Sequence, residues 1–164
     1  MGEVVNMPEI RKARDEDHHV LAQIWNQGWH DAHAVHVPQR LTDLRTKESF
    51  YIRLHQMLAQ TFVSGPIGAP IGFCAVKGDE IYQMYVHKDA KGTGVAAALI
   101  SAGCENIAQQ GFRRAKLDVI AQNSRARRFY EKMGWVSQGL HESEVDTLDG
   151  PFALPCILMT KNLG

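Results

Sequence analysis

Two glycines one residue apart stand between a predicted strand and a predicted helix, in the segment KDAKGTGVAAALI at residues 88–100. Gly92 and Gly94 can adopt backbone angles that other residues avoid, so residues 91–95 can turn several N–H groups toward one point. The helix that begins at Val95 adds free N–H groups and the positive end of its dipole at the same place. The segment therefore predicts either a phosphate-binding loop or a tight turn from strand to helix, because short glycine motifs recur by chance.

The spacing of apolar residues predicts strands and helices on both sides of this loop. Strands are expected at residues 9–13, 61–63, 71–76, 80–87, 115–121, 135–145 and 152–161. Helices are expected at residues 15–30, 41–58, 95–110 and 123–133, with Asp15 capping the first and Gly134 following the last. The resulting order of elements is βααβββαβαββ, and no linker or repeat divides it.

The composition bounds the class of protein. With 164 residues, 45% of them hydrophobic, the chain is long enough for one globular domain, which we expect to span residues 1–164. Its 18 Lys and Arg balance 18 Asp and Glu, so no nucleic-acid partner is expected. No apolar stretch has the length of a signal-peptide core or a membrane span, so we expect a cytoplasmic protein with no membrane partner. The oligomeric state is left open, with a homodimer as one expected form.

The cysteines suggest neither a disulfide framework nor a zinc site. Cys74, Cys104 and Cys156 are odd in number, far apart in the sequence and without CxxC spacing. Chains built on disulfides or structural zinc show paired or closely spaced cysteines. Buried thiols are therefore expected.

A second motif decides what the glycine loop binds. A Walker loop would need GxxxxGK[ST], which the sequence lacks. The segment GTGVAA fits the dinucleotide pattern, but a polar run separates it from the preceding strand and too few βα units follow. The segments YVHKDAKGTGVAAALI and LDVIAQNSRARRFYEKMGW instead resemble the acyl-CoA-binding core of the GCN5-related N-acetyltransferase (GNAT) superfamily, over residues 80–135. The resemblance implies a GNAT-like α/β fold, with a mixed, mainly antiparallel sheet flanked by helices.

The resemblance also implies acetyl-CoA as the cosubstrate, with its pyrophosphate in the glycine loop. The family usually carries Gln or Arg three residues before the first glycine, where this chain has Asp89. An acidic residue would repel phosphate, so we expect Asp89 to point away and the backbone N–H groups to carry the contact. The expected cofactor-binding residues are Met84, Tyr85, Val86, Lys91, Gly92, Thr93, Gly94, Val95, Ala96, Asn123, Ala126 and Tyr130.

Acetyl transfer to an amine needs a base, an oxyanion donor and an acid. Glu80 stands where histone-type members of the superfamily carry a base glutamate, although a solvated Glu beside a turn explains it equally well. Backbone N–H groups at residues 84–86 are the expected oxyanion donors. Tyr130 matches the tyrosine that the family places near the CoA sulfur, and a phenol is protonated at neutral pH. Its alternative role is a core aromatic residue.

The segment GWHDAHAVHVP is expected to line the acceptor pocket, because the resemblance places the link between the first two helices there. Trp29, His30 and His33 are the expected acceptor-binding residues, with a histidine as a spare base. The alternative is an ordinary polar helix end. The spacing of His30, His33 and His36 spreads them around a helix and no carboxylate or Cys completes a set, so no metal is expected.

These features together predict an acetyl-CoA-dependent N-acetyltransferase that acts on a small amine or a peptide amine. Direct transfer in a ternary complex is expected, since no cysteine in the motifs is placed to carry an acyl group. The alternative is a catalytically inactive CoA-binding module with a regulatory role. Glu80 and Tyr130 favour the enzyme over the module without excluding the module.

Overall fold

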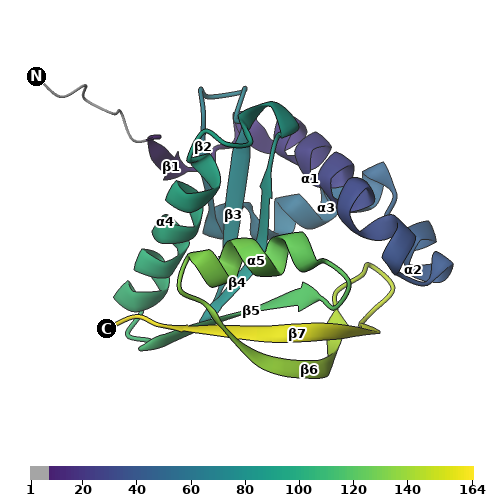
Figure 1. Ribbon diagram of the computed structural model, residues 1–164. Helices are drawn as coiled ribbons and strands as arrows, with labels where there is room; N and C mark the ends of the chain where they lie inside the picture. The colour runs from purple at the N-terminus through teal and green to yellow at the C-terminus, as the bar shows by residue number, and fades with distance from the viewer. Residues whose placement is uncertain (1–7) are drawn as a thin grey trace, which may run out of the picture.

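The computed structural model describes residues 8–164, so the first seven residues of the expected domain lie outside the described residues. One seven-stranded sheet runs through the molecule in the order β1-β2-β3-β4-β5-β7-β6, with helices packed on it (Figure 1). The strands are β1 (Ile10–Lys12), β2 (Thr61–Ser64), β3 (Gly72–Lys77), β4 (Glu80–Val86), β5 (Arg114–Ile120), β6 (Val136–Val145) and β7 (Phe152–Asn162). The helices are α1 (His18–His33), α2 (Gln39–Leu44), α3 (Lys47–Met57), α4 (Val95–Gln109) and α5 (Ser124–Lys132).

The sheet is antiparallel except where β4 meets β5. These two parallel strands pair at a single position, Glu80 opposite Lys116, and then diverge (Figure 1). The edge of β4 that faces β5 is therefore left without a strand partner toward its carboxyl end. The strands therefore form two half-sheets, β1 to β4 and β5 to β7, which pair with each other at one corner.

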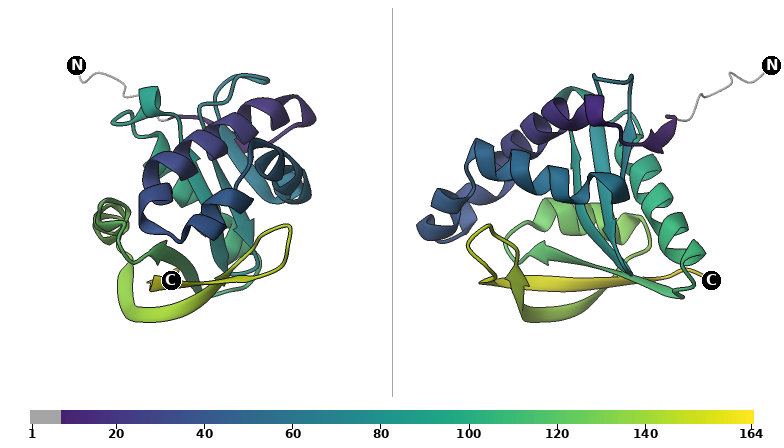
Figure 2. Two further views of the ribbon diagram at one scale, coloured as in Figure 1. Left: turned by 90° about the vertical axis from the view of Figure 1, so that its right-hand side faces the viewer. Right: turned by 180° about the vertical axis from the view of Figure 1, so that it is seen from behind.

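Helices cover both faces of the sheet, and the alternating directions of the apolar side chains of β3 explain why. Phe73 and Ala75 join a core cluster with α1 and α3, whereas Cys74 and Val76 join a second cluster with α4 and α5. Successive side chains of a strand point to opposite faces, so a strand buried on both sides reads as a continuous apolar run. Seen from behind, α1 and α3 lie in front of the strands, opposite α4 and α5 (Figure 2).

Two glycines let helices approach the sheet closely. A Cβ atom at Gly28 of α1 would lie 2.6 Å from Cδ1 of Tyr85 on β4. A Cβ atom at Gly103 of α4 would lie 2.7 Å from Cδ1 of Ile81 and 2.9 Å from Sγ of Cys74. Helix α1 thus packs closely on the diverging end of β4, and α4 packs closely near its paired start.

The expected order of elements is wrong at the second helix, where the structure has three helices before β2. The sequence pattern predicts one helix over residues 41–58, but α2 ends at Leu44 and α3 begins after Thr46. The Thr46 side chain accepts a hydrogen bond from the N–H of Ser49 at 3.1 Å, which is an N-cap that starts a new helix. The order is therefore βαααβββαβαββ.

The first helix also differs from its expected limits. A short 3₁₀ turn, Asp15–Asp17, precedes it, so Asp15 does not cap α1, and α1 continues to His33 instead of ending at His30. The glycine expected after the last helix is confirmed, because Gly134 follows α5 with a φ angle of 93°. Gly111 follows α4 in the same way, with a φ angle of 98°. In the part of the chain that the structure describes, no helix is both long and apolar enough to cross a bilayer.

Candidate active site

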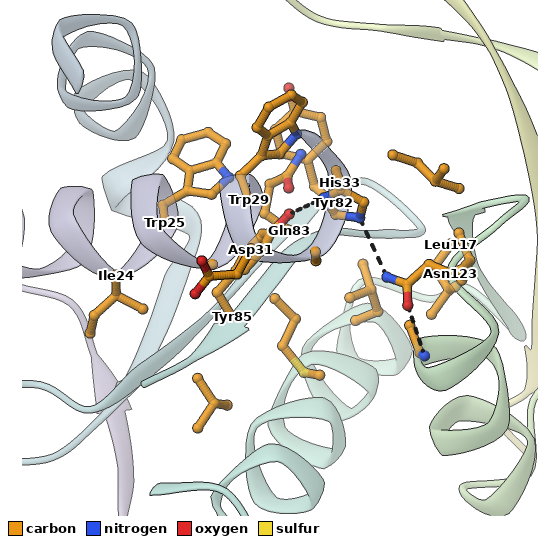
Figure 3. Close-up of a pocket in the computed structure, with 18 of the residues that line it drawn as sticks. Ile24, Trp25, Trp29, Asp31, His33, Tyr82, Gln83, Tyr85, Leu117 and Asn123 are labelled. Carbon is orange, nitrogen blue, oxygen red and sulfur yellow. Dashed lines mark hydrogen bonds between the residues drawn. The ribbon is translucent and has the colours of Figure 1, made fainter. Parts of the chain in front are cut away.

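A single groove with a volume of about 1980 Å³ follows the opening between β4 and β5. Residues of α1, β4, the start of α4, β5, α5 and the segment from β6 to β7 line it. Figure 3 shows part of this lining, with Trp29 and His33 from α1 on one side and Asn123 on the other. The glycine loop therefore lies at one part of the groove and the link from α1 to α3 at another.

The glycine loop presents unpaired N–H groups at the start of α4. Gly92 and Gly94 have φ angles of 80° and 86°, in the region that favours glycine. The N–H groups of Lys91 and Thr93 are satisfied by carbonyls within the loop. Within residues 8–164, no backbone carbonyl accepts from the N–H groups of Gly92, Gly94, Val95, Ala96 and Ala97. A run of free N–H groups at a helix N-terminus suits an anion.

Some residues of the glycine loop line the groove, whereas the side chains of others are directed away from it. Lys91, Gly92, Gly94 and Ala96 line the groove. The Thr93 hydroxyl instead donates to the carbonyl of Ala90, and the Val95 side chain is buried in the core, so these two expected cofactor residues offer the groove no side chain. The carboxylate of Asp89, 81% exposed, lies outside the groove and 3.6 Å from Nδ1 of His87.

The end of β4 contributes both backbone and side chains to the site. Met84, Tyr85 and Val86 all line the groove. The N–H of His87 donates to the carbonyl of Ile71 on the β3 side, at 2.7 Å. Because N–H groups alternate in direction along a strand, those of Val86 and Met84 are directed toward the opening between β4 and β5.

Helix α5 supplies three expected residues. The Asn123 side chain caps the helix, because its Oδ1 accepts from the N–H of Ala126 at 3.2 Å. Tyr130 lines the groove and packs edge-on against Trp135, with ring centroids 6.0 Å apart. Burial raises the pKa of the Tyr130 phenol above its usual value, so the hydroxyl keeps its proton at neutral pH.

His33 connects α1 to β4 and α5. Its Nε2 accepts from the amide nitrogen of Asn123 at 3.4 Å, since Oδ1 of Asn123 is already used in the cap (Figure 3). Its Nδ1 lies 3.5 Å from the hydroxyl of Tyr85. Burial, with a smaller effect from His36 and then Arg45, lowers the pKa of His33 to about 4. His33 is therefore neutral at physiological pH.

Trp29 and His30, the other expected acceptor residues, are placed differently from each other. Trp29 lines the groove and is 5% exposed. His30 does not line it, because Nε2–H of His30 donates to the backbone carbonyl of Arg45 at 2.8 Å and its ring packs against Phe50. His30 thus holds the turn between α2 and α3.

Glu80 lines the groove at the corner where the half-sheets meet. Burial, and next the negative charge of Asp118, raise the pKa of the Glu80 carboxyl above its usual value. Asp118 itself accepts hydrogen bonds from Nε2 of His141 at 2.6 Å and from the Ser143 hydroxyl at 2.8 Å. A carboxyl with a raised pKa suits a base that must hold and release protons near neutral pH.

A polar cluster that the sequence reasoning missed lines the groove beside Trp25 and Trp29. It consists of Arg45, Arg53, Tyr82 and Asp146. The Tyr82 hydroxyl donates to Oδ2 of Asp146 at 2.5 Å and accepts from Nη2 of Arg53 at 3.3 Å. Thr46, an N-cap residue type directly after Arg45, is a local signal for the break between α2 and α3, but no local signal indicates that Arg45 turns inward.

The residues that the structure describes contain no candidate metal site. Across residues 8–164, no three His, Cys, Asp or Glu side chains form a group that could hold a metal ion.

Comparisons with known proteins agree with this geometry. The peptidyl-lysine N-acetyltransferase YjaB of Escherichia coli is 27% identical over 146 residues, covering 88% of this chain and 92% of YjaB. A GCN5-related N-acetyltransferase of Rhodopseudomonas palustris superposes with a TM-score of 0.74 at 26% identity, covering 99% of each chain. The PaiA N-acetyltransferase of Thermoplasma acidophilum, solved in complex with coenzyme A, has the same fold at 19% identity and a TM-score of 0.64, covering 96% of this chain and 99% of its own.

The family assignment rests on a longer match than the motifs around the glycine loop. The sequence model of the acetyltransferase (GNAT) domain matches residues 30–148, which extends from the end of α1 to the segment between β6 and β7. This range covers well over half of the chain and includes most of the groove. The protein therefore belongs to the GNAT family and is an acetyltransferase of that type.

Proposed function

We propose that this acetyltransferase moves the acetyl group of acetyl-CoA to the amine of an acceptor, by direct attack in a ternary complex. The observation that carries the proposal is the continuity of one groove from the glycine loop to the link between α1 and α3. A donor anchored at the loop and an acceptor at the other part of the groove can meet at the opening between β4 and β5. The CoA complex of the T. acidophilum protein supports this use of the fold.

The free N–H groups of the glycine loop are the proposed anchor for the pyrophosphate of acetyl-CoA. They lie at the positive end of α4, whose dipole favours an anion. The side chain of Lys91 lines the same part of the groove and adds a positive charge. Neither contact involves the carboxylate of Asp89, which lies outside the groove.

Backbone N–H groups of Met84 and Val86 are the proposed donors to the thioester oxygen. They lie on the unpaired edge of β4, so no strand competes for them. When the acceptor nitrogen attacks the carbonyl carbon, negative charge develops on this oxygen and fixed donors stabilise it. The C–S bond then breaks, leaving the acetyl group on nitrogen and a thiolate on CoA.

Proton transfers are assigned to Glu80 and Tyr130. Glu80 takes a proton from the acceptor amine, directly or through water, and its raised pKa favours this exchange. His33 is the weaker candidate for this base, because a pKa of about 4 leaves little drive to accept a proton. Tyr130 donates its phenolic proton to the departing thiolate, for which its protonated state at neutral pH is suited.

A thermal shift with acetyl-CoA, followed by thiol release across a panel of amines and lysine peptides, tests the proposed function. We expect acetyl-CoA to raise the melting temperature and at least one amine to release CoA thiol. A shift without turnover for any amine would favour the inactive CoA-binding module. Peptide acceptors are included because YjaB of E. coli is a peptidyl-lysine N-acetyltransferase.

A further inference from the structure

Two buried guanidinium groups lie in the acceptor part of the groove. Arg45, at the end of α2, is 4% exposed, and Arg53, in the middle of α3, is 6% exposed. Both side chains line the groove. Arginine is among the residue types that are almost never buried unless paired, so each needs an explanation.

Neither guanidinium is satisfied by the protein. Nη1 of Arg45 donates to the carbonyl of Asp146 at 2.6 Å, and its Nε–H has no partner among the described residues. Within the same described residues, the side chain of Arg53 makes one hydrogen bond, to the hydroxyl of Tyr82 at 3.3 Å. No carboxylate within residues 8–164 forms an ion pair with either group. Since a guanidinium carries five N–H donors, most of the donors of both are unused.

Burial makes the unpaired Nε–H of Arg45 costly, whereas the other unused donors of the two guanidiniums are not fully buried. Burial lowers the pKa of Arg45 to about 10, and the positive charge of Arg53 is the second cause. Two like charges held in a buried site without counter-ions destabilise a fold unless something pairs with them. An anion that enters the groove would relieve both the repulsion and the unmet hydrogen bonds.

Aromatic rings hold both guanidiniums in place. Cζ of Arg45 lies 5.6 Å from the ring centroid of Trp29, and Cζ of Arg53 lies 4.6 Å from that of Trp25. Contact with a ring face leaves the N–H donors at the edge of the guanidinium available to a planar oxyanion. Both rings project from α1 in Figure 3, which places this site on the α1 side of the groove.

The charge balance favours a single carboxylate over a phosphate. Among the described residues, Asp146 is the acidic residue whose charge acts on Arg45. Its carboxylate accepts a hydrogen bond from Tyr82 and lies 3.7 Å from Nζ of Lys77. Lys77 is 70% exposed, so solvent screens its charge, and the two guanidiniums with the carboxylate of Asp146 leave one positive charge. A monoanion neutralises this charge, whereas a phosphate dianion would leave an excess of negative charge in a buried site.

We propose that the acceptor amine carries a carboxylate group, as an amino acid does, and that Arg45 and Arg53 bind this carboxylate. This inference rests on the proposed function, since it describes the acceptor of the same transfer. The carboxylate anchors the acceptor on the α1 side of the groove, and the amine extends toward the opening between β4 and β5. The two arginines are specificity-determining residues for the acceptor.

Matched pairs of amines test the inference. Amino acids and ω-amino acids of increasing length are compared with their primary amides as acceptors, with thiol release from saturating acetyl-CoA as the readout. We expect kcat/KM for accepted carboxylates to exceed that of the amides by about tenfold to hundredfold, as for loss of charged hydrogen bonds. Arg45→Gln and Arg53→Gln should abolish this preference mainly through KM. Arg40→Gln, an exposed residue of α2, should keep it.

The outcomes separate the two proposals. Equal rates for acids and amides, or a preference that survives in Arg45→Gln and Arg53→Gln, overturns the carboxylate site while leaving the proposed function intact. If no amine is acetylated, the proposed function fails and ligand-induced stabilisation decides the inference. N-acetyl amino acids should then raise the melting temperature of the wild type, while their amides, and each Gln variant with either ligand, show no shift. Stabilisation by inorganic phosphate instead would overturn the carboxylate.

The melting temperatures of the variants without ligand show whether the substitutions disturb the fold. Because neither buried guanidinium forms an ion pair with a described residue, Arg45→Gln and Arg53→Gln should melt at or above the wild-type temperature. Lower melting temperatures for both variants would show that the arginines are structural and would overturn the site. Arg53→Lys adds a conservative test, since a lysine keeps the charge but loses the planar fork, and should restore only part of the preference.

Discussion

Glu80 is the residue whose titration should govern the acidic side of the pH profile. As a base it must be ionised, so kcat/KM of the wild type should fall as the pH drops through its raised pKa. Glu80→Gln should lower kcat/KM at pH 7 by about a hundredfold and remove this acidic limb. Steady-state rates from pH 5 to about 9 with a fixed amine, once an accepted one is found, provide the measurement, with exposed Glu105→Gln as the control.

Glu80→Gln should also change the stability of the fold, and it should raise stability at the pH at which it lowers activity. A carboxyl with a raised pKa in the fold favours the protonated form, so its stabilising contribution is present at low pH and lost as the pH rises through that pKa. Glu80→Gln should therefore melt above the wild type at pH 7 and match it at low pH. If kcat/KM of Glu80→Gln still falls at low pH, as in the wild type, the base is water or another group.

Tyr130 can be tested by removing one oxygen atom. Tyr130→Phe keeps the ring contacts with Phe129 and Trp135 and loses the proton donor. We expect kcat to fall about tenfold or more while the Kd for acetyl-CoA is unchanged. Tyr51→Phe, on an exposed ring of α3, is the matched control. An unchanged kcat would mean that water protonates the thiolate.

At the scale of elements, the glycine loop and the end of α4 offer a matched pair of backbone positions. Gly94 and Gly111 have φ angles of 86° and 98°, and no heavy atom lies within 4 Å of a Cβ at either. Alanine at either position should cost the fold about 1 kcal/mol through backbone strain. Gly94→Ala alone should weaken acetyl-CoA binding, measured by titration calorimetry. Equal affinities for both variants would remove the loop from the cofactor site.

Asp17 joins three elements near the amino-terminal end of the described chain. Its buried carboxylate receives two hydrogen bonds from Arg11 of β1, at 2.7 and 2.9 Å, and one from the N–H of Gly68 in the β2–β3 turn at 2.9 Å. Another comes from the N–H of Arg14 at 2.8 Å. Asp17→Asn should cost about 2 to 3 kcal/mol in urea unfolding, because a charged pair loses its buried member. Exposed Asp15→Asn, in the same turn, should cost little.

The cost of Asp17→Asn should depend on pH in a defined window. Burial raises the pKa of this carboxyl, but the hydrogen bonds from Arg11, Arg14 and Gly68 outweigh it and lower the pKa to about 2, from 3.8 when unperturbed. A depressed pKa gives stability that is complete above the unfolded value and is lost as the pH falls through the folded one. The difference between wild type and variant should therefore shrink between about pH 4 and pH 2. If the difference in the free energy of unfolding does not change with pH, the variant loses packing contacts and not a charged interaction.

At the scale of the whole molecule, the two half-sheets make a prediction about ligand binding. They share a single paired position, so a ligand that contacts β4 on one side and α5 on the other should brace them. Acetyl-CoA should slow amide hydrogen exchange at the glycine loop and also along β4 and β5, and leave the outer strand β6 unchanged. Gly94→Ala at the same concentration is the control. Protection confined to the loop would show that the half-sheets are already rigid.

The sequence predicts most of the fold, because the information for it is local. The glycine after the last helix and the spacing of apolar residues depend on neighbours in the chain, and the structure has most of the elements that they predict. The mistaken single helix at residues 41–58 came from apolar spacing that continues across the break, where Thr46 provides the stop. The family and its fold followed from the glycine loop and the Asn123 motif together.

The acceptor part of the site could not be predicted in the same way. Arg45 and Arg53 lie among charged residues of amphipathic helices, where arginine is normally solvated. Their burial depends on Trp25, Trp29 and Asp146, which come from distant parts of the sequence. His30 and His33 are three residues apart, yet one holds a backbone carbonyl and the other faces the groove. Such differences are set by tertiary packing and leave no local pattern.

The strand order also determines when the groove can form as the chain folds. β2, β3 and β4 pair in sequence order through short turns, and β6 and β7 form a hairpin that β5 joins. Contacts between neighbours in sequence close with the least loss of chain entropy, so these two units can assemble separately. Among the described strands, the two units pair only where the parallel strands β4 and β5 meet, and this pairing needs α4 as a crossover. The groove is therefore absent from either unit alone and arises when the two dock.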